Sequence, residues 1–249
     1  MAEEILTGIH AVTAVLTHNP GRVSQLYVNE KRRNNRLDPL LELANNLQLP
    51  VREVTRDRLD RLAENQIHQG IVARCEALAL RTEKELVWDV KALQHPAMLL
   101  VLDGVQDPHN LGACIRTLNG AGGDGIVIPR DRSAPVTSVV HKIASGAMET
   151  TPLYTVTNLS RTLQQLKSEC GLWIFGTTDH AEKSLYQLDL TGSFALVLGA
   201  EGKGMRRLVE EHCDELVAIP MQGTVNSLNV SVASGVCCYE AVRQRTVNT

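Results

Sequence analysis

The chain has 249 residues and a formal net charge of −3 at pH 7, with 25 Lys and Arg against 28 Asp and Glu. This balance excludes a uniformly basic protein that coats nucleic acid, because phosphate binding needs concentrated Lys and Arg. The length allows a sizeable core and lies near the size at which chains divide, so we expect two domains.

The six cysteines show no C-x-x-C pair and no His and Cys ligand spacing. Neither a zinc site nor a disulfide framework is therefore expected, and a reducing cytoplasm suits the chain best. The longest apolar runs have the length of strands, and the first residues lack the basic and apolar regions of a signal peptide. We expect no metal ion and no membrane role.

The first part of the chain predicts a small α/β domain over residues 1–78. Apolar residues at helical spacing predict a helix from about Gly8 to Leu16, and short strands and helices alternate after it. A basic loop is expected between the strand Gln25–Val28 and the helix after Pro39. It contains Lys31, Arg32, Arg33 and Arg36. This loop is a candidate RNA contact, although a charge run of this kind is equally compatible with a solvated face.

Residues 79–96 mix charges with few periodic apolar positions and end at Pro96, which predicts a linker. From Ala97 onward, apolar runs of about five residues alternate with segments of helix length. These runs are MLLVLD, GIVIP, LWIFGT, FALVLG and ELVAIP. Near-continuous apolar strands suit a parallel sheet that is covered on both faces. We therefore expect a doubly wound α/β domain over residues 97–249.

Three of these strands run into polar or glycine-rich turns. Asn110 and Arg116 follow the first strand, and Gly199–Gly204 follows FALVLG. After the last strand, Ser227 and Asn229 are placed to cap a helix that runs towards Arg245. Open α/β sheets bind ligands at strand ends, and helix N-termini attract anionic groups. The three turns are therefore candidates for one shared binding site.

In this order, the three junctions resemble the three motifs of the SpoU (TrmH) family of RNA ribose 2′-O-methyltransferases. The motif residues are Asn110, Gly112, Ala113, Arg116 and Thr117; Leu198, Gly199, Glu201 and Gly204; and Ile219, Pro220 and Met221 with Ser227–Ala233. The segments Gly8–Val12 and His68–Ala73 look like the small, ribosomal protein L30e-like RNA-binding domain of the family's bacterial ribosomal members.

The resemblance implies methyl transfer from S-adenosylmethionine to the ribose 2′-hydroxyl of a guanosine in the peptidyl-transferase region of 23S rRNA. It implies the rRNA or the assembling large ribosomal subunit as partner. It also implies a trefoil knot in the last part of the chain, and a homodimer. We hypothesise that Arg116 of one subunit acts at the cofactor pocket of the other. Small residues from Ser231 to Cys238 suit close packing in a dimer, and they suit packing within one chain as well.

The resemblance assigns catalysis to Arg116, Asn110, Glu201, Ser227 and Asn229. It assigns cofactor binding to Gly199, Ile219, Leu228, Thr177, Thr178, Glu201, Gly204, Pro220 and Met221. Arg116 suits a clamp on phosphate or ribose, because an ordinary arginine is a poor base. A general-base role would require strong desolvation or a neighbouring group that takes the proton.

Plainer structural explanations also exist for these residues. Asn110, Ser227 and Asn229 could be helix caps. Glu201 could be an exposed carboxylate in a turn. Ile219 and Leu228 could be ordinary residues of the hydrophobic core. Two other functions stay open, a tRNA ribose methyltransferase and a non-catalytic RNA-binding or assembly protein. The added amino-terminal domain favours rRNA over tRNA, and the intact motif residues favour an active enzyme.

Overall fold

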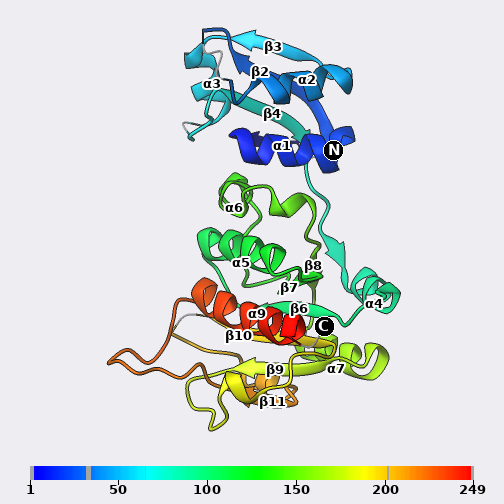
Figure 1. Ribbon diagram of the computed structural model, residues 1–249, viewed down its shortest axis with the longest axis vertical. Coiled ribbons are helices and arrows are strands. Elements are labelled where there is room, and N and C mark those ends of the chain that lie inside the picture. The colour runs from blue at the N-terminus through cyan, green and yellow to red at the C-terminus, as the bar shows by residue number, and fades with distance from the viewer. Residues whose placement is uncertain (1–2, 32–34, 65, 201, 248–249) are drawn as a thin grey trace. The chain divides into compact units, whose positions relative to one another are not determined.

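A computed structural model describes residues 3–31, 35–64, 66–200 and 202–247 (Figure 1). The chain divides into two compact units. Unit 1 comprises Met1–Ala79 and Val136–Thr150, and unit 2 comprises Leu80–Pro135 and Thr151–Thr249. In the described parts of the chain, no helix combines the length and the apolar character needed to cross a membrane.

Unit 1 is a small mixed sheet with helices packed against it. Its elements are β1 (Glu3–Thr7), α1 (Ile9–His18), η1 (Pro20–Arg22), β2 (Val23–Asn29), α2 (Asp38–Asn46), β3 (Val51–Val54), α3 (Arg56–Leu62), β4 (Ile71–Glu76), α6 (Ser138–Ala144) and η2 (Ala147–Glu149). The sheet order is β1-β4-β2-β3. β4 pairs antiparallel with both β1 and β2, and β2 pairs parallel with β3.

Helix α1 forms where the sequence predicted a helix, because its apolar residues recur at helical spacing. Ala11, Val12, Val15 and Leu16 are buried and face the core of the unit. Full burial of a Val or Leu side chain stabilises a fold by roughly 1.5–3 kcal/mol. Strand β1, which precedes this helix, was not predicted, since its alternation is short and begins with exposed Glu3.

Segment 136–150 packs into unit 1 although it lies in the span that was expected to form the methyltransferase domain. A group of buried polar residues joins this segment to the rest of unit 1. Arg22 forms an ion pair with Glu4, and its Nη1 lies 2.6 Å from Oε2 of Glu149. His141 Nε2 lies 3.1 Å from Oε2 of Glu4. Because Glu149 and His141 have almost no exposed side-chain surface, the segment is part of the interior of this unit.

Unit 2 is a parallel α/β layer structure, as the sequence predicted. Its elements are β5 (Arg81–Thr82), α4 (Glu83–Ala92), β6 (Met98–Asp103), α5 (Pro108–Gly120), β7 (Gly125–Pro129), β8 (Leu153–Val156), α7 (Leu159–Cys170), β9 (Trp173–Thr177), η3 (Leu185–Gln187), β10 (Phe194–Gly199), α8 (Arg207–Glu210), β11 (Glu215–Val217) and α9 (Val230–Val247). The sheet order is β11-β9-β10-β6-β7-β8-β5, and every pair is parallel.

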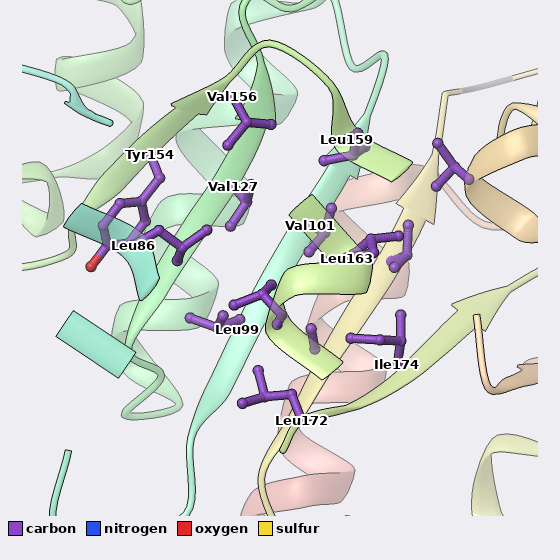
Figure 2. Packing of buried hydrophobic residues seen from close by; sticks show 14 of the residues in the cluster. Leu86, Leu99, Val101, Val127, Tyr154, Val156, Leu159, Leu163, Leu172 and Ile174 are labelled. Carbon is purple, nitrogen blue, oxygen red and sulfur yellow. The ribbon is translucent and has the colours of Figure 1, made fainter. Parts of the chain in front are cut away.

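Helices cover both faces of this sheet, which makes it doubly wound. Figure 2 shows one core, in which Leu86 of α4 and Leu163 of α7 pack with Leu99 and Val101 of β6. Helices α5 and α9 pack against each other, and they contact β7 and β10 respectively (Figure 1). The alternating side chains of the central strands β6, β7 and β10 are therefore buried on both sides, which explains their continuous apolar sequence.

The expected linker, 79–96, holds regular structure. Thr82 and Glu85 form a capping box that starts α4, and Leu86 and Val90 are buried in the core of unit 2. Strand β5 pairs with β8 at the edge of the sheet. Lys84, Glu85 and Lys91 are exposed on this helix, and its apolar positions are too few to reveal it from sequence alone.

Candidate functional site

A pocket of about 740 Å³ lies at the carboxyl ends of β9 and β10. The described residues that line it come from three segments: Thr177, Thr178, Asp179 and His180; Leu198, Gly199, Ala200, Gly202, Lys203, Gly204, Met205 and Glu210; and Ile219, Met221, Asn226, Ser227, Leu228, Asn229, Val230 and Ala233. This is the edge at which parallel α/β sheets bind ligands. Pockets for small molecules commonly measure about 300–1,000 Å³, so the size suits a nucleoside-like cofactor.

The loop after β10 folds back on its own beginning. Ala200 N–H donates to the Gly204 carbonyl over 3.1 Å, and Gly204 N–H donates to the Ala200 carbonyl over 2.9 Å. A Cβ on Gly199 would lie only 2.1 Å from the Gly204 carbonyl carbon. Gly204 itself has a φ of 64°, which favours glycine. Close packing of the loop therefore requires glycine at position 199, and the backbone conformation favours glycine at position 204.

The beginning of α9 is fixed by Asn229. Its Oδ1 accepts hydrogen bonds from the N–H and the hydroxyl of Ser231, over 2.9 and 2.6 Å. Its Nδ2 donates to Oδ1 of Asn110 over 3.0 Å. The capping explanation thus holds for Asn229, but it is incomplete, because the same side chain also joins the third motif to the first.

Asn110 is not the cap of α5. That position is held by Asp107, whose Oδ1 accepts a hydrogen bond from the N–H of His109 over 2.9 Å. Asn110 lies in the first turn and accepts the hydrogen bond from Asn229. Ser227 is exposed on the pocket wall, and Asn229 occupies the capping position before α9. The two plain capping explanations for Asn110 and Ser227 are therefore wrong.

Most of the expected cofactor residues lie together. Those that line the pocket are Thr177, Thr178, Gly199, Gly204, Ile219, Met221 and Leu228. Pro220 is exposed between two lining residues and is not among them. Glu201, which was expected to act in catalysis and in cofactor binding, lies outside the described residues. Contact of any of these residues with a ligand stays a prediction.

Arg116 is an exposed residue on α5, about 1.7 turns beyond Asn110, and it is not among the described residues that line the pocket. Lys31 and Arg36 are exposed in the turn region between β2 and α2 of unit 1. Arg32 and Arg33 lie outside the described residues. The site therefore contains two of the four described residues expected in catalysis, Ser227 and Asn229, with Asn110 attached to its edge.

Sequence reasoning missed an ionisable group on the pocket wall. His180 Nδ1 lies 2.6 Å from the Thr178 hydroxyl oxygen, and its Nε2 lies 3.2 Å from Oε1 of Glu210. The hydrogen bond with Glu210, followed by that with Asp179, raises the pKa of His180 above its ordinary value. No motif could have indicated this group, because α8 brings Glu210 to the pocket from 30 residues away.

Among the described residues, no group of three or more His, Cys, Asp or Glu side chains is placed to hold a metal ion. The wall consists of glycine-rich backbone, hydroxyl groups and apolar side chains such as Leu198, Ile219 and Leu228. Backbone N–H and C=O groups are suited to the polar edge of a base, and apolar side chains are suited to its faces.

Two family models match the chain. The SpoU rRNA Methylase family matches residues 97–239, and the RNA 2′-O ribose methyltransferase substrate binding family matches residues 5–80. This chain belongs to the SpoU rRNA methylase family.

Its relatives are similar over almost their whole length. It is 51% identical to the 23S rRNA (guanosine-2′-O-)-methyltransferase RlmB of Haemophilus influenzae, over 98% of this chain and 99% of that protein. It is 50% identical to the protein of the same name from Pseudomonas putida, over 98% of each.

Solved structures share the fold. The SpoU methyltransferase AviRb from Streptomyces viridochromogenes, in complex with the cofactor AdoMet, matches with a TM-score of 0.82 at 23% identity, covering 98% of this chain and 91% of that chain. At that identity the match concerns the fold alone. An RNA 2′-O ribose methyltransferase structure matches with a TM-score of 0.78 at 25% identity, covering 98% and 89%.

Proposed function

We propose that this chain transfers a methyl group from S-adenosylmethionine to the ribose 2′-hydroxyl of a guanosine in 23S rRNA, as a step of ribosome biogenesis. The identity of about half of all residues to RlmB proteins, across both family-model regions, supports this activity. One structural observation carries it: three loops from distant parts of unit 2 line one pocket, and the Asn110–Asn229 hydrogen bond joins the first motif to its edge.

The pocket fits S-adenosylmethionine by its size and by the chemistry of its wall. Glycine-rich backbone from Gly199 to Gly204 allows close approach, and Ile219 and Leu228 offer apolar surface to an adenine ring. Thr177, Thr178 and Met221 complete the set that would hold the cofactor. When bound, the cofactor supplies an electrophilic methyl group on a sulfonium.

The residues around the pocket would hold and orient the ribose. Methyl transfer in line with the leaving sulfur requires a positioned hydroxyl, and positioning alone supplies much of a rate enhancement. Ser227 and Asn229 lie on the pocket wall with short polar groups that suit this role. Arg116 would clamp the RNA phosphate or ribose, and its use as the base that takes the hydroxyl proton is the less favoured alternative.

Several finer features belong to the same proposal. The last part of unit 2 forms the trefoil knot of the family, and the chain works as a cytoplasmic homodimer. Because Arg116 lies on α5 and is not among the described lining residues, Arg116 of the partner subunit would complete the pocket. Unit 1 would bind the rRNA or the assembling large subunit, with the loop at 31–36 as its contact.

The decisive experiment incubates the full chain with labelled S-adenosylmethionine and separate samples of 23S rRNA, 16S rRNA and tRNA, and then maps the ribose methylation. We expect label at a guanosine of 23S rRNA. The Arg116→Ala chain is the matched control and should bind the donor but transfer little label. Label in tRNA alone would overturn the rRNA assignment. The absence of label in every RNA would overturn the proposal that the chain is an RNA methyltransferase.

A further inference from the structure

Asp103, the last residue of β6, is a fully buried carboxylate at the same edge of the sheet as the pocket. Its side chain has no exposed surface. Oδ2 accepts a hydrogen bond from the backbone N–H of Arg206 over 2.8 Å, and Oδ1 accepts one from Arg206 Nε over 2.7 Å. Arg206 Nη2 lies 2.6 Å from Oδ1. An aspartate is almost never fully buried unless it is paired, and here one residue supplies all three contacts.

Arg206 is the residue that follows the pocket loop Gly199–Met205. The loop starts at Gly199, which pairs with Asp103 in the register of β10 and β6. It closes on itself through the hydrogen bonds between Ala200 and Gly204. The sheet therefore holds the start of the loop beside Asp103, and the carboxylate of Asp103 holds its end. The carboxyl end of β6 therefore holds both ends of the loop that forms one wall of the pocket.

The chain after Asp103 leads directly to the first motif. Gly104 has a φ of 85°, and a Cβ built on it would lie 3.6 Å from the Cβ of Ala200, so the two loops lie close together. A few residues on, Asp107 caps α5, and Asn110 in the first turn of that helix accepts the hydrogen bond from Asn229. Asp103 thus lies between the segment that carries Asn110 and the loop that forms the pocket wall.

We propose that Asp103 is a positioning residue, which through Arg206 fixes the end of the pocket loop, Gly202–Met205, in its pocket-forming position and thereby sets the affinity for the methyl donor. This inference rests on the proposed function. A pair that only stabilised the fold would lower the melting temperature and leave the affinity of the folded protein unchanged. A pair that positions the loop changes the affinity as well, because the variant must order the loop at the moment of binding.

Titration calorimetry of the full-length chain with S-adenosylmethionine and with S-adenosylhomocysteine tests this role. Arg206→Gln and Asp103→Asn should each weaken binding about tenfold or more, since each removes charge-assisted hydrogen bonds. The double variant should bind no more weakly than the weaker single variant, because both changes break the same contact. In turnover assays the KM for the donor should rise more than kcat falls.

Arg207→Ala is the matched control. Arg207 is the neighbouring arginine, and its Nη1 lies 3.4 Å from Oε1 of Glu211 in an exposed pair. This variant should bind the donor like the wild-type chain. If Asp103→Asn does not fold, Arg206→Gln and Arg206→Lys still test the inference, because Arg206 is half-exposed. Arg206→Lys should bind the donor more tightly than Arg206→Gln. Wild-type affinity in folded Arg206→Gln would overturn the inference. Absence of donor binding by the wild-type chain would instead overturn the proposed function, and this inference with it.

Discussion

Single side chains in this site carry out two tasks at once. Asn229 ends a loop by capping α9 and also holds Asn110 of α5 through its amide nitrogen. His180 joins Thr178 to Glu210 across the pocket wall. An amide or an imidazole suits such a position because it presents two polar atoms in fixed directions. At this scale, a substitution that preserves size can still remove one of the two contacts.

Replacing Glu210 by Gln should lower the pKa of His180, because the carboxylate is the largest cause of its elevation. The raised pKa means that the folded state binds the proton more tightly than the unfolded chain does. The pair therefore stabilises the fold below the ordinary histidine pKa of about 6.5, and this contribution is lost as pH rises through the pKa of the folded state. An NMR titration of the imidazole measures the shift. Glu211→Gln should leave it unchanged, and an unaltered value in Glu210→Gln would refute the assignment.

At the scale of elements, the pocket is made by strand ends and by the loops that leave them. Strands β6 and β10 are adjacent, so the turns after them touch, although 95 residues separate Gly104 from Gly199 in the chain. The loop after β10 packs on itself so closely that its first residue has no space for a side chain. Glycine at this position is a requirement of packing and does not depend on a ligand.

Gly199→Ala should destabilise the folded chain by about 1–3 kcal/mol and weaken donor binding. The new Cβ would lie 2.1 Å from the Gly204 carbonyl carbon and 2.3 Å from the Met205 nitrogen, and backbone atoms must move to make room. Denaturant unfolding and calorimetry measure the two effects. Gly192→Ala, where nothing lies within 4 Å of the added atom, should change the stability by less than about 0.5 kcal/mol. Equal stability of the two variants would contradict the packing argument.

At the scale of the whole molecule, the chain passes between the two units three times. Unit 1 takes its sheet from residues before Ala79, and it takes α6 and the short helix η2 from Val136–Thr150. The contacts of Arg22 with Glu149 and of His141 with Glu4 join these two stretches. Burial acts to raise the pKa of Glu4, but the neighbouring His141 and Arg22 outweigh it, and the pKa is lowered. Stability from Glu4 is therefore present above the ordinary glutamate pKa and is lost as pH falls through the lowered value.

Glu149→Ala should destabilise unit 1 by about 1–3 kcal/mol, because it leaves partly buried donors of Arg22 and Asn19 without their carboxylate. Hydrogen exchange of the full chain under native conditions would locate the loss, which should concentrate in α1, β1 and α6. Glu3→Ala removes an exposed partner of Arg74 and should have little effect. If α1, β1 and α6 exchange at the same rates in Glu149→Ala as in the wild-type chain, the segment 136–150 is not part of this unit's interior.

The sequence by itself determined the parallel α/β layer and the three motifs, because continuous apolar runs and glycine-rich turns are local signals. It did not reveal β1, β5 or α4, whose apolar positions are too few to form a period. Only the tertiary structure decided that Asn110 accepts a hydrogen bond from Asn229, that Glu210 reaches His180, and that Asp103 holds Arg206. These contacts join residues far apart in the chain, and strand order places them side by side. No local pattern of residues encodes which strands become neighbours.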